Sequence, residues 1–246
     1  MLDHFDICGK RFLISGASSG LGLGMVDSFI KQGAQVVGLG RNASLFMELE
    51  SKYGSSFEGI RIDLSKTNEI ESVLMGLITG KFDGFVHAAG VIYRRPIKLM
   101  TSDTFTETMN VNVISGGLIA KFLLKSKRLN PDASLVYISS VASDYAAIGN
   151  TMYMSSKGAV NSMVRGLALE FSKYGVRVNG IEPGLIKTHL TDGISSDEIN
   201  AAITQYPLGR LGEIKDVENA VQFALSGASS WMTGQFLRID GGLTLK

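Results

Sequence analysis

Little in the sequence suggests a disulfide-rich, disordered or strongly charged protein. Cys8 is the single cysteine among 246 residues, so no disulfide can form within the chain, which indicates a reducing compartment. There are four prolines against 29 glycines, which favours many tight strand-to-helix turns over disorder. The formal net charge is +1, and both signs are dispersed, so we expect no nucleic-acid or membrane-surface partner.

Long hydrophobic runs and metal-binding patterns are missing as well. No stretch of 18 or more apolar residues occurs, which predicts no membrane span. The first residues carry Asp3 and Asp6 without a leading basic run, unlike a secretory signal. His4 and His189 show no metal-ligand spacing with cysteine or carboxylates, so we expect no catalytic metal. We therefore expect a cytoplasmic protein.

What the sequence has is an alternation of short β-rich runs and longer helical patterns. Most of the short runs are almost continuously apolar, as in strands buried on both faces of a parallel sheet. We expect one α/β domain over residues 1–246, a Rossmann-type, doubly wound parallel sheet of about seven strands with helices on both faces. The expected strands are Arg11–Ser15, Gln35–Leu39, Gly59–Ile62, Gly84–His87, Ser134–Ile138, Arg177–Ile181 and Gln235–Ile239. The expected helices are Leu21–Gln32, Glu69–Leu77, Thr104–Lys127, Thr151–Lys173 and Lys215–Leu225.

Two local signals refine this outline. Gly33 and Gly175 follow expected helices and have the position of glycines that end a helix in a left-handed conformation. The least regular segment is Leu185–Tyr206, which has few periodic apolar residues. A long irregular segment in a compact domain is often functional, so we predict a substrate lid at 185–206, with a plain surface excursion as the alternative.

The segment SGASSGLG, Ser15–Gly22, follows the first expected strand and opens the first expected helix. Its glycines permit a tight turn and a close approach of the backbone to a pyrophosphate, and the helix N-terminus offers free N–H groups. The alternative is a glycine-rich turn that only lets helix and strand pack together. We predict a phosphate-binding turn formed by Gly16, Ser18, Ser19, Gly20, Leu21 and Gly22.

The end of the second expected strand bears on the choice of nucleotide. An acidic residue there would accept hydrogen bonds from the ribose hydroxyls of NAD. The chain has Gly40 at that place, followed by Arg41 and Asn42, and a guanidinium suits a 2′-phosphate. We therefore favour NADP(H) over NAD(H), with a solvated surface arginine as the alternative. Asp63 and Leu64, after the third expected strand, are expected near the adenine, although Asp63 could equally be a capping residue.

Tyr153 and Lys157 stand four residues apart in the longest helical pattern, so they share one face of that helix. A cation beside a phenol favours the phenolate and lowers a pKa that starts near ~10. We therefore expect a tyrosine that serves as an acid or base near neutral pH. The pair is a weak signal by itself, because short patterns recur by chance.

Further motifs follow in a consistent order and spacing. Together with the glycine turn and YMSSK (Tyr153–Lys157), they resemble the single-domain branch of the short-chain dehydrogenase/reductase family, from about Gly9 to Gly242. The additional motifs are VHAAG (Val86–Gly90), Asn112 in MNVNVIS, YISS (Tyr137–Ser140), NGIEPGLIKT (Asn179–Thr188) and TGQFLRIDGG (Thr233–Gly242).

The resemblance implies a catalytic tetrad of Asn112, Ser140, Tyr153 and Lys157. In such a tetrad the serine polarises the substrate carbonyl, and the tyrosine exchanges a proton with it as hydride is transferred from or to the nicotinamide. The lysine lowers the tyrosine pKa and binds the nicotinamide ribose, while the asparagine, in a distorted helix, holds a water that links the lysine to solvent.

The resemblance also extends the cofactor site and exposes one departure from the family pattern. His87 and Ala88 stand where the family usually has two asparagines, and we expect His87 to be a hydrogen-bonded residue behind the site rather than a catalyst. Further cofactor contacts are expected from Ala88, Ala89, Gly90, Tyr153, Lys157, Pro183, Gly184, Ile186 and Thr188.

The substrate is harder to infer, because loops decide it. The chain looks most similar to 3-oxoacyl-[acyl-carrier-protein] reductases, and such an enzyme needs a basic surface near the pocket to receive an acidic carrier protein. Tandem arginines after the AAG turn are instead similar to sugar-acid members such as gluconate 5-dehydrogenase. The basic surface was expected from Lys125, Lys127, Arg128 and Lys173, and substrate contacts from Arg94, Arg95, Ala142, Tyr145 and Asn150.

Two further alternatives concern activity and assembly. A non-catalytic NADP(H)-binding regulator would keep the fold without turnover, and a scaffold would have neither cofactor binding nor turnover. The resemblance implies a homotetramer, assembled through the segments 104–127, 151–173 and 235–239.

Overall fold

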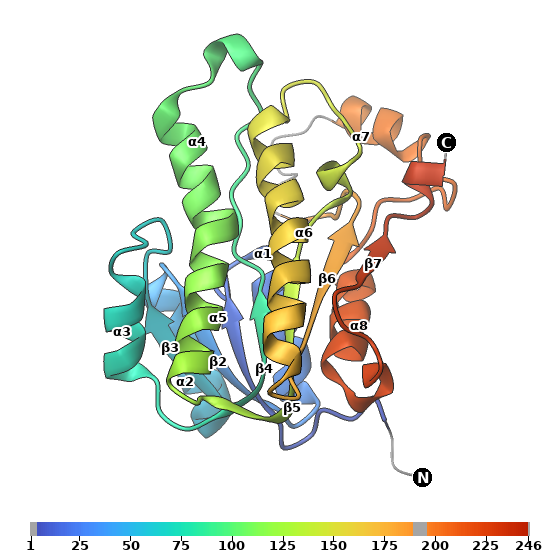
Figure 1. Ribbon diagram of the computed structural model, residues 1–246. Helices are drawn as coiled ribbons and strands as arrows, with labels where there is room; N and C mark the ends of the chain where they lie inside the picture. The colour runs from blue at the N-terminus through green and yellow to red at the C-terminus, as the bar shows by residue number, and fades with distance from the viewer. Residues whose placement is uncertain (1–3, 189–195, 246) are drawn as a thin grey trace.

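A seven-stranded parallel sheet forms the centre of the computed structural model, which describes residues 4–188 and 196–245 (Figure 1). The strand order is β3-β2-β1-β4-β5-β6-β7, and each adjacent pair is parallel. The chain therefore starts near the centre at β1, winds out to one edge at β3, returns to the centre at β4 and winds out to the other edge at β7. The strands are β1 (Arg11–Ser15), β2 (Gln35–Gly40), β3 (Phe57–Arg61), β4 (Phe82–His87), β5 (Leu129–Ile138), β6 (Arg177–Pro183) and β7 (Phe236–Ile239).

Helices cover both faces of this sheet, so the predicted doubly wound fold is confirmed. Helices α3, α5 and α6 pack on one face, α1, α2 and α8 pack on the other, and α4 extends α5 beyond the sheet (Figure 1). The helices are α1 (Gly20–Lys31), α2 (Ala43–Tyr53), α3 (Ile70–Leu77), α4 (Ser102–Met109), α5 (Ser115–Lys125), α6 (Thr151–Ser172), α7 (Ser196–Ile203) and α8 (Ile214–Leu225).

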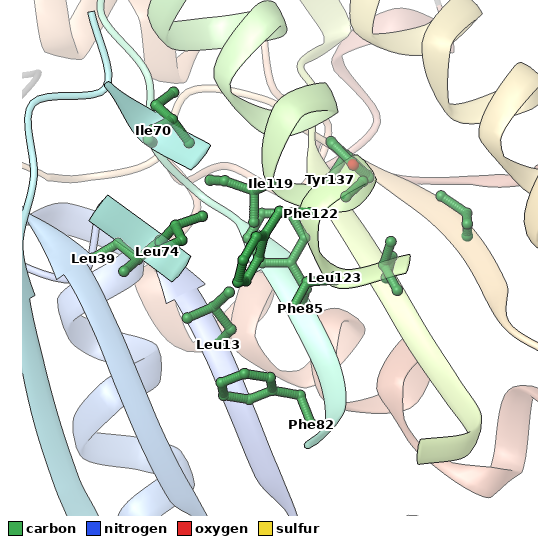
Figure 2. Close-up of a cluster of buried hydrophobic side chains, with 14 of the residues drawn as sticks. Leu13, Leu39, Ile70, Leu74, Phe82, Phe85, Ile119, Phe122, Leu123 and Tyr137 are labelled. Atoms are coloured by element: carbon green, nitrogen blue, oxygen red, sulfur yellow. The ribbon is translucent and has the colours of Figure 1, made fainter. Parts of the chain in front are cut away.

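Two hydrophobic clusters join the sheet to its helices. On one face, Phe85 of β4 meets Phe122 of α5 and packs edge-on against Tyr137 of β5 (Figure 2). On the other face, Phe12 of β1 packs against Phe29 of α1 with ring centroids 5.4 Å apart. Burying each such side chain contributes about 1.5–3 kcal/mol, which makes the sheet a rigid platform for whatever its carboxyl ends carry.

Several boundaries differ from the expectation. The single helix expected over Thr104–Lys127 is divided into α4 and α5 by a π-helical turn, η3 (Asn110–Ile114). Helix α2 was not expected, and only its Phe46 and Leu49 are buried. Gly33 and Gly175 end α1 and α6 with φ of +84° and +72°, as predicted.

The segment expected as a lid is partly helical. Helix α7 lies inside it, while residues 189–195 lie outside the described residues. A third, smaller cluster places Ile199 and Ile203 of α7 against Tyr206, Val141 and Leu243, apart from the two sheet cores. Within the described part of the chain, no helix is long and apolar enough to cross a membrane.

Candidate active site

A cavity of about 470 Å³ opens at the carboxyl ends of the central strands, toward the upper end of Figure 1. The strand order reverses between β1 and β4, and ligands of open α/β sheets bind beside that point. Most residues predicted from sequence line the cavity, including three of the four predicted catalytic residues. Those are Gly16, Ser18, Ser19, Gly20, Leu21, Arg41, Asp63, Leu64, Ala88, Ala89, Gly90, Arg94, Ala142, Tyr145, Asn150, Ser140, Tyr153, Lys157, Pro183, Gly184, Ile186 and Thr188.

Close packing explains the glycines of the first turn. Gly16 has φ of +73°, and a Cβ there would lie 2.8 Å from the backbone of Ala89. Gly22 does not line the cavity, contrary to the prediction that it contacts the cofactor. A Cβ on Gly22 would lie 2.2 Å from the carbonyl oxygen of Gly16, so this glycine lets α1 start against the turn. The turn thus brings the free N–H groups of α1 to the cavity floor, which fits a pyrophosphate.

At the end of β2, Gly40 has no side chain, and the neighbouring residues fill the space that one would need. A Cβ on Gly40 would lie 2.7 Å from Oγ of Ser18, so an acidic side chain does not fit there without displacement. Arg41 is exposed and lines the cavity next to the N-terminus of α2. Asn42 does not line the cavity: its side chain caps α2 by accepting a hydrogen bond from N–H of Leu45 at 3.1 Å. Its predicted cofactor contact is therefore not supported by its position.

Asp63 combines the two roles that the sequence left open. It lines the cavity, and its Oδ1 accepts hydrogen bonds from the backbone and hydroxyl of Ser65 at 3.0 and 2.8 Å. Burial opposes its ionisation, but these bonds and the charges of Arg41 and Lys66 outweigh it and lower the pKa of Asp63. A carboxylate thus stays charged near Arg41, at the part of the cavity beside the ends of β2 and β3.

Tyr153, Ser140 and Lys157 converge on the cavity from two elements. Ser140 follows β5 and begins the short helix η4 (Val141–Ser143), and its Oγ accepts a hydrogen bond from N–H of Ala142 at 3.1 Å. Tyr153 of α6 lines the same cavity as Ser140. Lys157 is 3% exposed, and its Nζ donates to the carbonyl oxygen of Ile138 at 2.8 Å.

The pKa of Tyr153 differs from the expectation. Burial raises it above its ordinary value, although the hydrogen bond of Ser140 and the charge of Arg94 act in the opposite direction. The expected net lowering of the pKa is therefore wrong: burial outweighs the nearby charges, although Nζ of Lys157 lies over the Tyr153 ring, 5.4 Å from its centroid, while it donates to the β5 backbone. Burial also lowers the pKa of Lys157 to about 8.

Asn112 lies behind the cavity, inside the π-helical turn, and does not line it. Its Oδ1 accepts from N–H of Val91 at 2.8 Å, and its Nδ2 donates to the carbonyl of Val91 and to Oγ of Ser156 at 3.0 and 2.9 Å. Its side chain is therefore committed to holding the loop after β4 against α6. A water linked to Lys157, as the resemblance implies, would have to use other atoms of this turn.

His87 is almost completely buried at the end of β4. Its Nδ1 lies 2.8 Å from Oγ of Ser15, which also accepts from N–H of Ala89 at 3.3 Å. Its Nε2 has no hydrogen-bond partner among residues 4–188 and 196–245, so the expectation of a fully hydrogen-bonded histidine is only half right. Burial lowers the pKa of His87 to about 3, so its ring is neutral.

The tandem arginines separate in the structure. Arg94 lines the cavity, and its charge reaches Tyr153. Arg95 does not line the cavity, contrary to its predicted substrate contact, and its backbone N–H donates to the carbonyl of Gly149 at 2.9 Å. That bond joins the loop after β4 to the loop before α6, so the two loops form one wall of the cavity.

Some lining residues were not foreseen. Leu243 was not marked by any motif, and Tyr206, the last residue of the predicted lid, was not singled out within it. Tyr206 is buried, and its hydroxyl accepts a hydrogen bond from N–H of Leu185 at 2.9 Å, directly after Pro183 and Gly184. The aromatic residue at the end of the predicted lid was the available signal, but its contact depends on the tertiary fold.

The basic surface expected for a carrier protein is in the wrong place. Lys125 ends α5 and Lys173 follows α6, so both lie at the end of the sheet opposite the cavity (Figure 1). Lys125 is also paired with Glu71 at 3.4 Å, and Arg128 donates to the carbonyl of Gly80 at 3.2 Å. Lys127, between them, shares that end. These four cations do not surround the mouth of the pocket.

Comparison with known proteins identifies the family. A family model described as Enoyl-(Acyl carrier protein) reductase matches residues 16–244. Gluconate 5-dehydrogenase of Gluconobacter oxydans is 30% identical, over 99% of this chain and 98% of the relative. The chain belongs to the short-chain dehydrogenase/reductase family. The resemblance inferred from the motifs is thereby confirmed.

Other relatives agree on fold and cofactor type. The 3-oxoacyl-[acyl-carrier-protein] reductase of Vibrio cholerae is 27% identical, over 96% of this chain and 97% of the relative. A gluconate 5-dehydrogenase from Burkholderia cenocepacia, solved with NADP and tartrate, has a TM-score of 0.91 and 27% identity, covering 100% of this chain and 99% of that chain. 4-Hydroxyisoleucine dehydrogenase complexed with NADH has a TM-score of 0.89 and 27% identity, covering 97% and 100%. This chain is accordingly a nicotinamide-dependent dehydrogenase or reductase.

Proposed function

We propose that this oxidoreductase interconverts a ketone and a secondary alcohol on a small substrate that carries a carboxylate, such as a keto or hydroxy sugar acid. The observation that carries the proposal is Arg94, which lines the cavity and whose charge reaches Tyr153. A guanidinium at that place favours an anionic group close to the reacting carbon. The gluconate 5-dehydrogenases among the relatives, one of them solved with tartrate, support this substrate class.

The proposed chemistry divides between cofactor and chain. The nicotinamide supplies or accepts the hydride. Tyr153 donates a proton to the substrate oxygen in reduction and removes it in oxidation, while Ser140 hydrogen-bonds the same oxygen. Because burial raises the pKa of Tyr153, the phenol is protonated at neutral pH, which suits reduction there; oxidation should accelerate as the pH rises. Asn112 is proposed to hold the loop after β4 against α6, and Lys157 to bind the nicotinamide ribose.

We propose NADP(H) as the preferred cofactor. The support is the pair of features at the end of β2: Gly40 leaves no room for an acidic side chain beside Ser18, and Arg41 lines the cavity. A guanidinium next to the N-terminus of α2 is a favourable environment for a 2′-phosphate. One structural relative contains NADP and another NADH, so the preference rests on this chain's own residues.

A second substrate class, the acyl thioesters of 3-oxoacyl-[acyl-carrier-protein] reductases, is favoured by another part of the cavity. Val141, Ala142, Ala147 and Leu243 give one wall an apolar surface that could receive an acyl chain. The carrier protein itself is a weaker proposal, because the expected basic surface lies at the opposite end of the sheet.

The proposed quaternary structure is a homotetramer. Leu169 of α6 is 80% exposed, and Arg165 stacks on the ring of Phe236 at the open edge of the sheet, 5.1 Å from its centroid. Exposed apolar surface of this kind is typical of subunit contacts. A monomer in light scattering at micromolar concentration would contradict the proposal.

The experiment that tests the substrate class is a panel of a 5-keto sugar acid, an acetoacetyl thioester and an uncharged diketone with NADPH. We expect turnover of the keto acid, and the Arg94→Met variant should raise its KM by about 10- to 100-fold, the loss of a charge-assisted hydrogen bond, while the diketone is unaffected. Arg95→Met is the matched control, because Arg95 does not line the cavity. If instead the thioester is turned over and neither Arg94→Met nor Arg95→Met changes its KM, the acyl class is favoured.

A further inference from the structure

A buried carboxylate lies directly behind the proposed catalytic residues. Glu182 precedes Pro183 near the end of β6 and is 4% exposed. Its Oε1 accepts hydrogen bonds from Oγ of Ser143 at 3.0 Å and from Nδ2 of Asn161 at 2.7 Å. Its Oε2 accepts from Nε and Nη2 of Arg238 at 3.0 and 2.8 Å. A charge that is removed from water needs such partners, and here both oxygens have them.

The carboxylate imposes a direction on a chain of hydrogen bonds. An ionised carboxylate only accepts, so it fixes Nδ2 of Asn161 toward itself and leaves Oδ1 facing the other way. Oδ1 accepts from Oγ of Ser139 at 2.6 Å, and the same hydroxyl lies 3.3 Å from the carbonyl oxygen of Lys157. The chain therefore ends at the residue next to Ser140 and on the backbone of Lys157.

Three segments that meet at Glu182 carry the proposed site. Ser143 ends η4, the short helix that Ser140 begins. Asn161 lies one helical turn after Lys157 on α6. Glu182 itself is followed by Pro183 and Gly184, which line the cavity. Glu182 thus contacts the elements that position the Ser140 hydroxyl, the Lys157 side chain and the part of the cavity wall formed by Pro183 and Gly184.

Arg238 of β7 supplies the counter-charge. Its Nη2 is shared with Oδ2 of Asp144 at 2.8 Å, and its Nη1 donates to the hydroxyl of Thr244 at 3.2 Å. The guanidinium therefore joins the last strand to the loop before α6 as well as to Glu182.

We propose that Glu182 is a positioning residue, which fixes Ser140 and Lys157 through Ser143, Asn161 and Ser139, and that Arg238 is the counter-ion that stabilises it. The inference rests on the proposed roles of Ser140 and Lys157. The carboxylate touches no reacting atom, and its effect is exerted through the geometry of those two side chains.

The substitution that tests this is Glu182→Gln, which keeps the shape and adds a donor. The new amide keeps its oxygen toward Arg238, so its NH₂ group must face Asn161. The side-chain amide of Asn161 must then turn to present its oxygen to that NH₂ group. Its own NH₂ group then faces Ser139, so the hydrogen bond to Ser139 reverses direction. We expect kcat to fall about tenfold, less than the roughly 100-fold that a displacement of about 1 Å can cause, with cofactor affinity in a fluorescence titration unchanged within about twofold.

Glu218→Gln is the matched control. Glu218 of α8 is another buried glutamate, 6% exposed, with Lys215 as its ion-pair partner at 3.7 Å, and it does not line the cavity. We expect this variant to lose stability without losing kcat. The contrast separates positioning from the general cost of altering a buried carboxylate.

A second variant keeps the inference testable if Glu182→Gln does not fold. Asn161→Ala interrupts the same chain without disturbing the ion pair, and it should lower kcat by a similar factor. In the double variant Glu182→Gln/Asn161→Ala, the fall in kcat should be smaller than the product of the two single effects, because both changes act on the Asn161–Ser139 chain, while Glu182 also acts through Ser143.

The outcomes distinguish this inference from the proposed function. Absence of wild-type turnover with every carbonyl substrate would contradict the proposed function, and crystal structures of wild type and Glu182→Gln would then decide the inference. We expect the Asn161 amide turned and Ser140 displaced in the variant. Unchanged kcat in both folded variants, or an unmoved Ser140, would overturn the positioning role.

Discussion

Replacing Lys157 should make the protein more stable near neutral pH and change how stability depends on pH. Burial lowers the pKa of this lysine from 10.5 to about 8. Between those values the unfolded chain binds a proton that the folded protein does not, so the free energy of unfolding rises with pH. For pKa values of 10.5 and about 8, this one group adds about 2 kcal/mol between pH 7 and pH 9.5.

The perturbation is Lys157→Met, which keeps most of the side-chain volume and removes the charge. The free energy of unfolding of wild type minus that of the variant should rise by about 2 kcal/mol between pH 7 and pH 9.5. The variant also loses the hydrogen bond to the carbonyl of Ile138, which costs about 1 kcal/mol at every pH and leaves the slope unchanged.

The assay is urea unfolding by circular dichroism at fixed protein concentration, at half-unit intervals from pH 7 to pH 9.5. Lys173→Met, at an exposed lysine, is the control and should follow the wild-type curve. If wild type and Lys157→Met have parallel curves, the ammonium is not desolvated by the fold, and the reasoning about this buried lysine is refuted.

Other predictions concern catalysis, cofactor choice and the glycine turn. Tyr153→Phe should lower kcat about 10²- to 10⁴-fold and leave cofactor affinity, measured by fluorescence, nearly unchanged; persistent turnover would exclude the proposed acid. Arg41→Ala should raise KM for NADPH about 10- to 100-fold and leave KM for NADH within about twofold, and equal effects on both would contradict the 2′-phosphate assignment. Gly16→Ala should weaken cofactor binding and lower Tm, since its Cβ would lie 2.8 Å from the backbone of Ala89.

The outline of the fold was predictable because strand burial leaves a direct record in the sequence. The run Arg11–Ser15 contains three consecutive apolar residues, Phe12, Leu13 and Ile14, so it is apolar on both faces, and the structure places a strand over it. Helix α2 was missed although Leu45, Phe46, Leu49 and Tyr53 recur at helical spacing, because the helix is short and only Phe46 and Leu49 of it are buried. The π-helical turn at Asn112 could not be located by periodicity, since a single extra residue per turn does not interrupt an apolar pattern.

The motifs of the candidate site could be predicted from the sequence, but the burial and the neighbours of its side chains could not. Adjacent arginines look equivalent in sequence, yet Arg94 lines the cavity while the backbone of Arg95 joins two loops. The direction of the Tyr153 pKa was wrong because spacing on a helix fixes the neighbour and not the degree of burial. Nothing in the sequence around Lys125 and Lys173 indicates that their helices end at the side of the sheet opposite the cavity.

The sequence by itself determined the parallel sheet, the tight glycine turn before α1 and the order of Ser140, Tyr153 and Lys157, because these depend on periodicity, glycine placement and local spacing. The tertiary structure alone decided which charges are buried, which arginine reaches the cavity, and that Glu182, Asn161 and Arg238 meet behind Ser140. Such contacts join residues from β6, α6 and β7, and the free energy of a buried charge depends on all the groups packed around it, which no local pattern records.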